Sequence, residues 1–149
     1  MGEPNVLETG LKFANPPEFV LVQLKNNIQG PCTQSLRGNP PRQIEPDGSQ
    51  PFEEERTKSM GYCIKNLHHL MENAILAQHY GIDLWNYTSV DGRSIKQAVR
   101  YLIPYMLGEK EWTNIQYKGL QSTMGNFREL LWVAHKYIDD DLIQLAYEQ

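Results

Sequence analysis

Residues 63–81 read CIKNLHHLMENAILAQHYG, and this stretch decides the fold class of the chain. Its apolar residues recur every three or four positions, which places them along one face of an α-helix. Gly81 stands where the C-terminal cap of such a helix belongs. The pattern predicts a long amphipathic helix that buries one face. The residues of that face are Ile64, Leu67, Met71, Ala74 and Ile75, with Cys63 and Leu70 at its edge.

Three later segments repeat the helical pattern. We expect Asp91 to cap a second helix that ends at Gly108, with Pro104 kinking its last turn. A third helix begins at about Thr123, and the acidic residues 139–141 precede a short final one. The connections between these segments are short and rich in aromatic residues, so antiparallel helical hairpins are the simplest topology. The expected fold class is all-α.

Residues 1–42 differ from the rest of the chain. Prolines and glycines interrupt every window before a helix of ordinary length can form. Residues 19–24, FVLVQL, carry the clearest ordered signal and would form one strand at most. We therefore expect an irregular, loosely ordered segment over 1–42 and a helical domain over 43–149.

Length and composition narrow the function classes. A chain of 149 residues can bury one core, and its apolar runs are too short to span a bilayer, so we expect no membrane partner. The formal net charge is -4, and this argues against a nucleic-acid partner, which needs clustered lysine and arginine. It argues only weakly against an acidic polysaccharide, because one or two cations in a cleft can bind carboxylates.

The cysteines and the first residues of the chain narrow the function classes further. Cys32 and Cys63 show no metal-ligand spacing, so we interpret both as structurally incidental, with a single disulfide as the alternative. We expect no metal and no cofactor. The opening residues, MGEPNVLETGLKF, lack a secretory signal pattern, so either the protein is cytosolic or its true N-terminus is missing.

The most informative stretch for function is residues 43–67, QIEPDGSQPFEEERTKSMGYCIKNL. Residues 46–49 form a turn signal, and the acidic residues 53–55 favour a helix N-terminus. In the helix that follows, four polar residues fall within one arc, well separated from the apolar face. They are Ser59, Tyr62, Asn66 and His69. The apolar face of this helix therefore packs, and its polar face points outward or into a cleft.

This stretch, together with GIDLWNY at 81–87, DGRSIKQAVRYLIPY at 91–105 and EWTNIQY at 111–117, resembles the C-terminal part of the alginate lyase domain family of polysaccharide lyases. The resemblance is good over about residues 43–117 and weaker to the end of the chain. It implies an all-α fold of antiparallel helical hairpins that form part of an incomplete (α/α) toroid, with a substrate groove across it.

The resemblance also implies a reaction, β-elimination at a uronic acid residue of a polysaccharide. Such an enzyme must neutralise the sugar carboxylate, remove the proton at C5 and protonate the departing glycosidic oxygen. Tyr62 matches the family's general acid, which serves with some substrates as the base too. Arg56 matches the arginine that steadies this tyrosine and the carboxylate, and a cation beside a phenol favours the ionised form. We expect substrate-binding roles for Gln50, Ser59, Asn66 and His69.

Each assignment has a simpler alternative. Arg56 could pair with Glu53, and Tyr62 could be an aromatic at the rim of the core. His68 and Glu72 have the spacing of a ligand pair, but two ligands are weak evidence for a metal. Four aromatic residues in the connections could stack on sugars, although packing is the favoured interpretation. They are Trp85, Tyr87, Trp112 and Tyr117.

The family's other catalytic element is an Asn-Asn-His-Gly segment, which neutralises the carboxylate and supplies a base. Here Asn26-Asn27 is followed by no histidine, so we expect this chain alone to be weak or inactive. The alternative is a truncated, non-catalytic helical module that binds acidic polysaccharide or nothing. By resemblance, alginate is the first substrate expected and glucuronan the next, acted on outside the cell or in the periplasm.

Overall fold

The computed structural model describes residues 43–149. Four expectations lie outside these residues: the irregular segment 1–42, the strand at 19–24, the Asn26-Asn27 element and the environment of Cys32. The helical domain expected over 43–149 is the part that can be compared with the structure.

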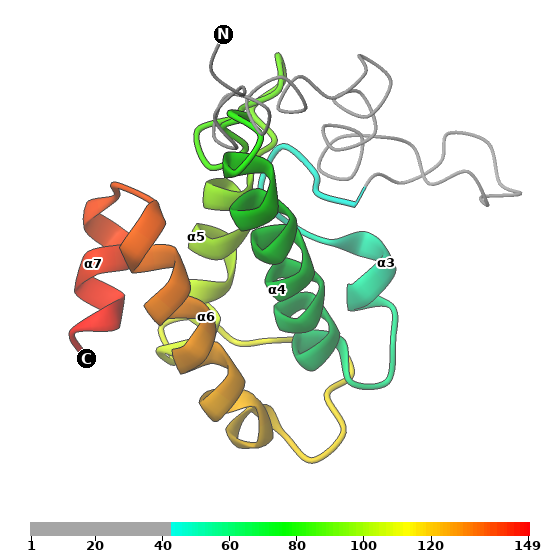
Figure 1. Cartoon of the computed structure of the whole chain (residues 1–149). Helices are drawn as coiled ribbons and strands as arrows, with labels where there is room; N and C mark the ends of the chain where they lie inside the picture. The colour runs from blue at the N-terminus through cyan, green and yellow to red at the C-terminus, as the bar shows by residue number, and fades with distance from the viewer. Residues whose placement is uncertain (1–42) are drawn as a thin grey trace, which may run out of the picture.

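Residues 43–149 form helices and connecting loops, with no β-strand in this range, so the all-α prediction is confirmed. Successive long helices run in alternating directions, as antiparallel hairpins should (Figure 1). The elements are α3 (Pro51–Glu54), α4 (Ser59–Gln78), α5 (Ile95–Met106), the 3-10 helix η1 (Leu120–Thr123), α6 (Met124–Tyr137) and α7 (Asp141–Tyr147). No helix among these described residues is long and apolar enough to cross a membrane.

The apolar face predicted for α4 forms the centre of the core. Ile64, Leu67 and Met71 are each almost fully buried, while Ile75, also predicted on this face, is only partly buried. Helix α5 is buried along one side, and α6 and α7 close the other flank of the same core (Figure 1). Cys63 is a free thiol inside this core, and burial raises its pKa, so it is an inert apolar residue here.

The start of α5 differs from the prediction. Its N-cap is Ser94, whose hydroxyl accepts a hydrogen bond from the Gln97 backbone N–H, and not Asp91. The Asp91 carboxylate instead binds the Ser89 hydroxyl and the Arg93 side chain within the preceding loop. The position of Asp91 in the sequence favoured it as the N-cap. In the structure its carboxylate instead accepts a hydrogen bond from the buried Arg93.

A buried arginine ties the segment before α3 to the helical core. The Arg93 guanidinium donates to the Ile44 carbonyl at 2.8 Å and forms an ion pair with Glu45 at 3.0 Å. It also donates to Asp91 at 2.7 Å. Because Arg93 is itself buried, these contacts fix the loop that leads into α3 and so set where α3 begins.

A second set of contacts holds the loop that follows α5 against the first turn of α4. The Ser59 backbone N–H donates to the Ile115 carbonyl at 3.1 Å, and the Tyr117 backbone N–H donates to the Thr57 carbonyl at 2.9 Å. The Lys58 and Gln116 backbones pair here as an isolated antiparallel bridge. Three segments, α3, the start of α4 and residues 115–117, therefore meet at one corner of the molecule.

Candidate active site

Arg56 and Tyr62 meet at this corner. Arg56 lies in the turn between α3 and α4, and Tyr62 lies one turn into α4, where its backbone N–H donates to the Lys58 carbonyl. The centre of the guanidinium is 3.3 Å from the centroid of the Tyr62 ring, a close cation–π contact. The structure therefore brings together the two residues expected to be catalytic.

The simpler alternative for Arg56 is present as well. Its guanidinium forms an ion pair with Glu53 at 2.9 Å, and the hydrogen bond to Glu53 is the largest cause of a raised pKa for Arg56. The arginine is about half exposed, so this surface pair contributes little to stability. Its chemical effect is to keep a protonated, oriented cation on the face of the Tyr62 ring.

Gln50 supports Asn66 from beneath the surface. The Asn66 side-chain amide donates to the Gln50 side-chain oxygen at 2.8 Å, and Gln50 is fully buried. The Gln50 side-chain nitrogen has no hydrogen-bond partner among the described residues. Asn66 is half-buried and lies one turn along α4 from Tyr62. Gln50 was expected to touch substrate, but its side chain is fully buried and contacts Asn66.

His69 stands at the outer end of the same face. Its side chain is 60% exposed and its Nδ1 lies 3.2 Å from a carboxylate oxygen of Glu72. The His68 ring points elsewhere, with its Nε2 lying 3.2 Å from the Asn126 carbonyl oxygen. Thus His69, and not His68, is the histidine that shares a surface with Tyr62.

Ser59, also expected to bind substrate, lies in the core. Its hydroxyl donates to the Ile115 carbonyl at 2.6 Å and accepts from the Trp112 indole N–H at 2.8 Å. The side chain is fully buried, so it is out of reach of a polysaccharide. The helical wheel placed it beside Tyr62 correctly, but the loop at residues 112–115 covers this end of the helix.

The remaining residues of the face line a shallow hollow with a volume of about 240 Å³. A neighbouring hollow of about 310 Å³ shares Glu53, Arg56 and Asn66 with it. The residues of the first are Glu53, Arg56, Tyr62, Lys65, Asn66 and His69. Lys65 was not expected here, although its position three residues after Tyr62 puts it on the same side of the helix. Its charge adds a second cation for an acidic ligand.

The aromatic residues of the connections divide between packing and exposure. Trp85 is buried and stacks on Tyr137 at 4.7 Å between ring centroids. Trp112 packs edge-on against Tyr105 at 5.0 Å. Tyr87 is partly buried against the core, whereas Tyr117 is exposed. Packing accounts for the first three, and Tyr117 remains open to a ligand.

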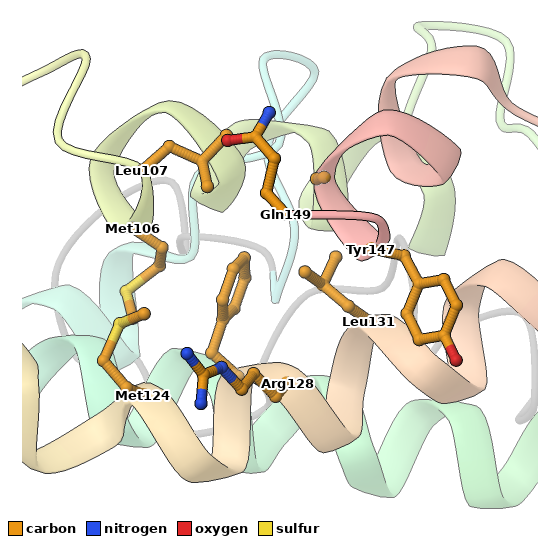
Figure 2. Close-up of a pocket in the computed structure, with 9 residues that line it drawn as sticks. Met106, Leu107, Met124, Arg128, Leu131, Tyr147 and Gln149 are labelled. Carbon is orange, nitrogen blue, oxygen red and sulfur yellow. The ribbon is translucent and has the colours of Figure 1, made fainter.

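A larger hollow lies away from this corner, between α5, α6 and α7 (Figure 2). Its volume is about 360 Å³ and its walls are mainly apolar, with Arg128 at one side. None of the residues predicted for the active site line it. Within residues 43–149, no group of three or more histidine, cysteine, aspartate or glutamate side chains could hold a metal ion.

Comparison with known proteins gives the family and the fold of this chain. The sequence model of the alginate lyase family matches residues 29–112, more than half of the chain. The crystal structure of an alginate lyase from Bacteroides ovatus is similar at 34% sequence identity, with a TM-score of 0.56 over 70% of this chain. The chain spans 32% of the length of that protein. No protein with a curated description matches the sequence.

The family match contains Gln50, Arg56, Tyr62, Asn66 and His69, and it reaches into the residues before 43. The solved relative supports the prediction that these antiparallel hairpins are part of an incomplete (α/α) toroid. The chain belongs to the alginate lyase family.

Proposed function

We propose that the corner around Tyr62 is the acid–base part of a polyuronide lyase site. The observation that carries the proposal is the contact between Arg56 and Tyr62, with the guanidinium 3.3 Å from the ring centroid. A partly exposed phenol beside a fixed cation suits proton transfer at an anionic sugar. The residues around the pair supply further groups that bind carboxylates.

The reaction is the β-elimination that membership of the alginate lyase family implies. A base removes the proton from C5 of a uronate, the bond from C4 to the glycosidic oxygen breaks, and a C4–C5 double bond forms. Tyr62 protonates the departing oxygen and, with suitable epimers, also takes the C5 proton. Arg56 and Asn66 bind the carboxylate, whose negative charge increases as C5 loses its proton. His69 contacts the sugar from the next turn of α4.

The activity of this chain by itself should be low. Tyr62 and His69 line the hollow and are the candidates to remove the C5 proton, while the carboxylate of Glu53, which also lines it, is paired with Arg56. Loss of one preorganised charge-stabilising contact commonly lowers the rate by about 100-fold to 1000-fold. We therefore propose a weak lyase, with alginate as the first substrate and glucuronan as the next, working outside the cell or in the periplasm.

A second candidate is a module that binds acidic polysaccharide without cleaving it. It is favoured by one observation, that the hollow at Tyr62 gathers two cations, Arg56 and Lys65, and the amide of Asn66. Binding requires only the cations and the amide of the α4 face, whereas elimination also requires a well-placed base.

The test is the rise in ultraviolet absorbance from unsaturated uronate. Purified chain is incubated separately with alginate, polymannuronate, polyguluronate and glucuronan at high protein concentration. We expect a slow rise with at least one polymer, and its loss in Tyr62→Phe, because only the phenolic oxygen is removed. Tyr80→Phe is the matched control, since Tyr80 is an exposed tyrosine just beyond the other end of α4.

A rise that persists in Tyr62→Phe would contradict the role of Tyr62. Binding of a polymer with no rise would favour the non-catalytic module, and it would name the polymer. Neither binding nor product with any of the four would contradict both candidates.

A further inference from the structure

Tyr117 is an exposed aromatic ring fixed next to the candidate active site. Its side chain is 60% exposed, yet its backbone N–H donates to the Thr57 carbonyl at 2.9 Å. Thr57 directly follows Arg56 in the turn between α3 and α4. Because the Tyr117 backbone is held by this hydrogen bond, its solvent-exposed ring loses little conformational entropy when a ligand packs on it.

Two lysines flank this ring. The Lys58 ammonium lies 6.0 Å from the ring centroid and the Lys118 ammonium lies 5.8 Å from it. Lys58 precedes α4 and its carbonyl accepts the Tyr62 backbone N–H, so Lys58 and Tyr62 are one helical turn apart. The cations beside Tyr117 therefore extend the positive charge of Arg56 and Lys65 along one side of the molecule.

The backbone at Lys118 is held in an unfavourable conformation. Its φ is 68°, in the left-handed region that a side chain with a Cβ rarely adopts. Gly119, with φ of 69°, follows it, and its backbone N–H donates to the Gln116 carbonyl at 3.0 Å. Such strain tends to gather at functional sites, where the surrounding structure holds a side chain in place.

We propose that Tyr117, Lys58 and Lys118 form a second uronate subsite, which binds another sugar of the same polymer whose reacting sugar lies at Tyr62. This inference rests on the proposed function. A uronate ring presents a face of C–H groups that can pack on an aromatic ring, and a carboxylate that can pair with an ammonium. A polyuronide repeats both features on every sugar, and the corner repeats an aromatic ring with a cation.

The structure also holds a matched control for this proposal. Trp132 on α6 is 55% exposed, and the Lys136 ammonium lies 5.6 Å from its ring. This pair has the same chemistry as the Tyr117 group but lies on α6, whereas the Tyr117 backbone is hydrogen-bonded to the turn between α3 and α4 that carries Arg56. If any exposed ring with a lysine binds polyuronide, both pairs will contribute equally.

The experiment is calorimetric titration with mannuronate and glucuronate oligosaccharides, one short and one long. The full chain carries Tyr62→Phe as background so that no cleavage occurs during the titration. Tyr117→Ala should bind the long oligosaccharide about threefold to tenfold more weakly and the short one unchanged, from the usual strength of such ring contacts. Lys118→Gly, which suits the left-handed backbone, should weaken binding by about twofold to fivefold and reduce its salt dependence.

Three results would overturn the subsite: no binding of any oligosaccharide by the background chain, unchanged binding in Tyr117→Ala, or an equal loss in Trp132→Ala. Failure of the proposed reaction is seen separately, because it appears as absent product in the ultraviolet assay while the titration still detects binding.

Discussion

At the scale of single residues, Arg56 contacts two neighbouring side chains, Tyr62 and Glu53. Its guanidinium lies on the Tyr62 ring and pairs with Glu53 at the same time. A planar guanidinium can stack on a ring and still present N–H donors at its edge, which a lysine ammonium cannot do. The arginine is therefore suited to orient the phenol and to bind a carboxylate.

Replacement of Arg56 should separate activity from stability. In Arg56→Lys the charge is kept but the stacking is lost, so we expect the rate of product formation to fall about tenfold or more. The free energy of unfolding should change by less than about 0.5 kcal/mol, because the site is exposed. Ultraviolet product assays and urea unfolding measure the two quantities. A parallel loss of both would mean that Arg56 is structural.

Ser59 is expected to show the opposite behaviour. Ser59→Ala removes the acceptor of the Trp112 indole N–H and the donor to the Ile115 carbonyl, and the Ser59 side chain itself is fully buried. We expect the free energy of unfolding to fall by about 1 to 3 kcal/mol. Ser122→Ala is the control, since its hydroxyl makes a similar bond to the Gly119 carbonyl at an exposed position. Equal changes in the two variants would contradict the structural role.

At the scale of elements, the turn before α3 is pressed against α5. Gly48 has φ of +94°, and a Cβ built there would lie 2.4 Å from the Gln97 carbonyl oxygen and 2.8 Å from the Tyr101 Cβ. The obstruction is mainly backbone, so it cannot swing away. This close approach, together with the Arg93 contacts, fixes where Gln50 and α3 stand relative to α4.

Gly48→Ala should therefore destabilise the fold more than its matched control, Gly92→Ala. Gly92 has nearly the same φ, +93°, but no atom lies within 4 Å of its added Cβ. We expect Gly92→Ala to cost about 1 to 2 kcal/mol from the backbone alone, and Gly48→Ala to cost at least about 1 to 3 kcal/mol more. Thermal unfolding measures both. Equal losses would show that the turn is not pressed on α5.

The start of α7 makes stability depend on pH. Asp140 caps this helix through the Leu142 and Ile143 backbone N–H groups and pairs with Arg100 at 2.6 Å. Burial alone would raise the pKa of this carboxyl, but the Arg100 hydrogen bond and the two N–H groups together outweigh burial and lower it. The Asp140 carboxylate thus stabilises the fold at and above the unfolded pKa of about 4, and this contribution is lost as the pH falls through the lower, folded value.

Asp140→Asn should flatten this dependence. We expect it to lower the free energy of unfolding by about 1 kcal/mol near neutral pH, and by much less at the acid end, where the native carboxyl is protonated too. Urea unfolding over a pH series measures the difference. Asp139→Asn, at the exposed neighbouring position, is the control. A constant difference at every pH would rule out the ionised cap.

At the scale of the whole molecule, the sequence predicted the helices better than their surroundings. The period of Ile64, Leu67 and Met71 predicted α4 because that pattern reflects the buried face directly. The same helical period placed Ser59 on the polar face of α4. In the structure Ser59 is buried under a loop more than fifty residues away in the chain. Contacts between segments far apart in sequence leave no local periodic signal.

In the candidate site, too, some residues could be predicted from the sequence and others are shown only by the structure. The resemblance to the family singled out Arg56 and Tyr62, and the structure brings these two together. It did not single out Lys65, although helical spacing could have done so, and it did not connect Lys58 with Tyr117. That connection depends on residues 115–117 folding back on the start of α4, which only the three-dimensional arrangement reveals.

We expect a polyuronide to bind along the corner formed by the start of α4 and residues 115–118. Backbone amide NMR of the full chain, titrated with a mannuronate oligosaccharide, tests it most directly. We predict that the shifts concentrate at Arg56, Tyr62, Asn66 and Tyr117. Shifts confined to the apolar hollow around Met124 and Arg128, or no shifts at all, would contradict binding at this corner.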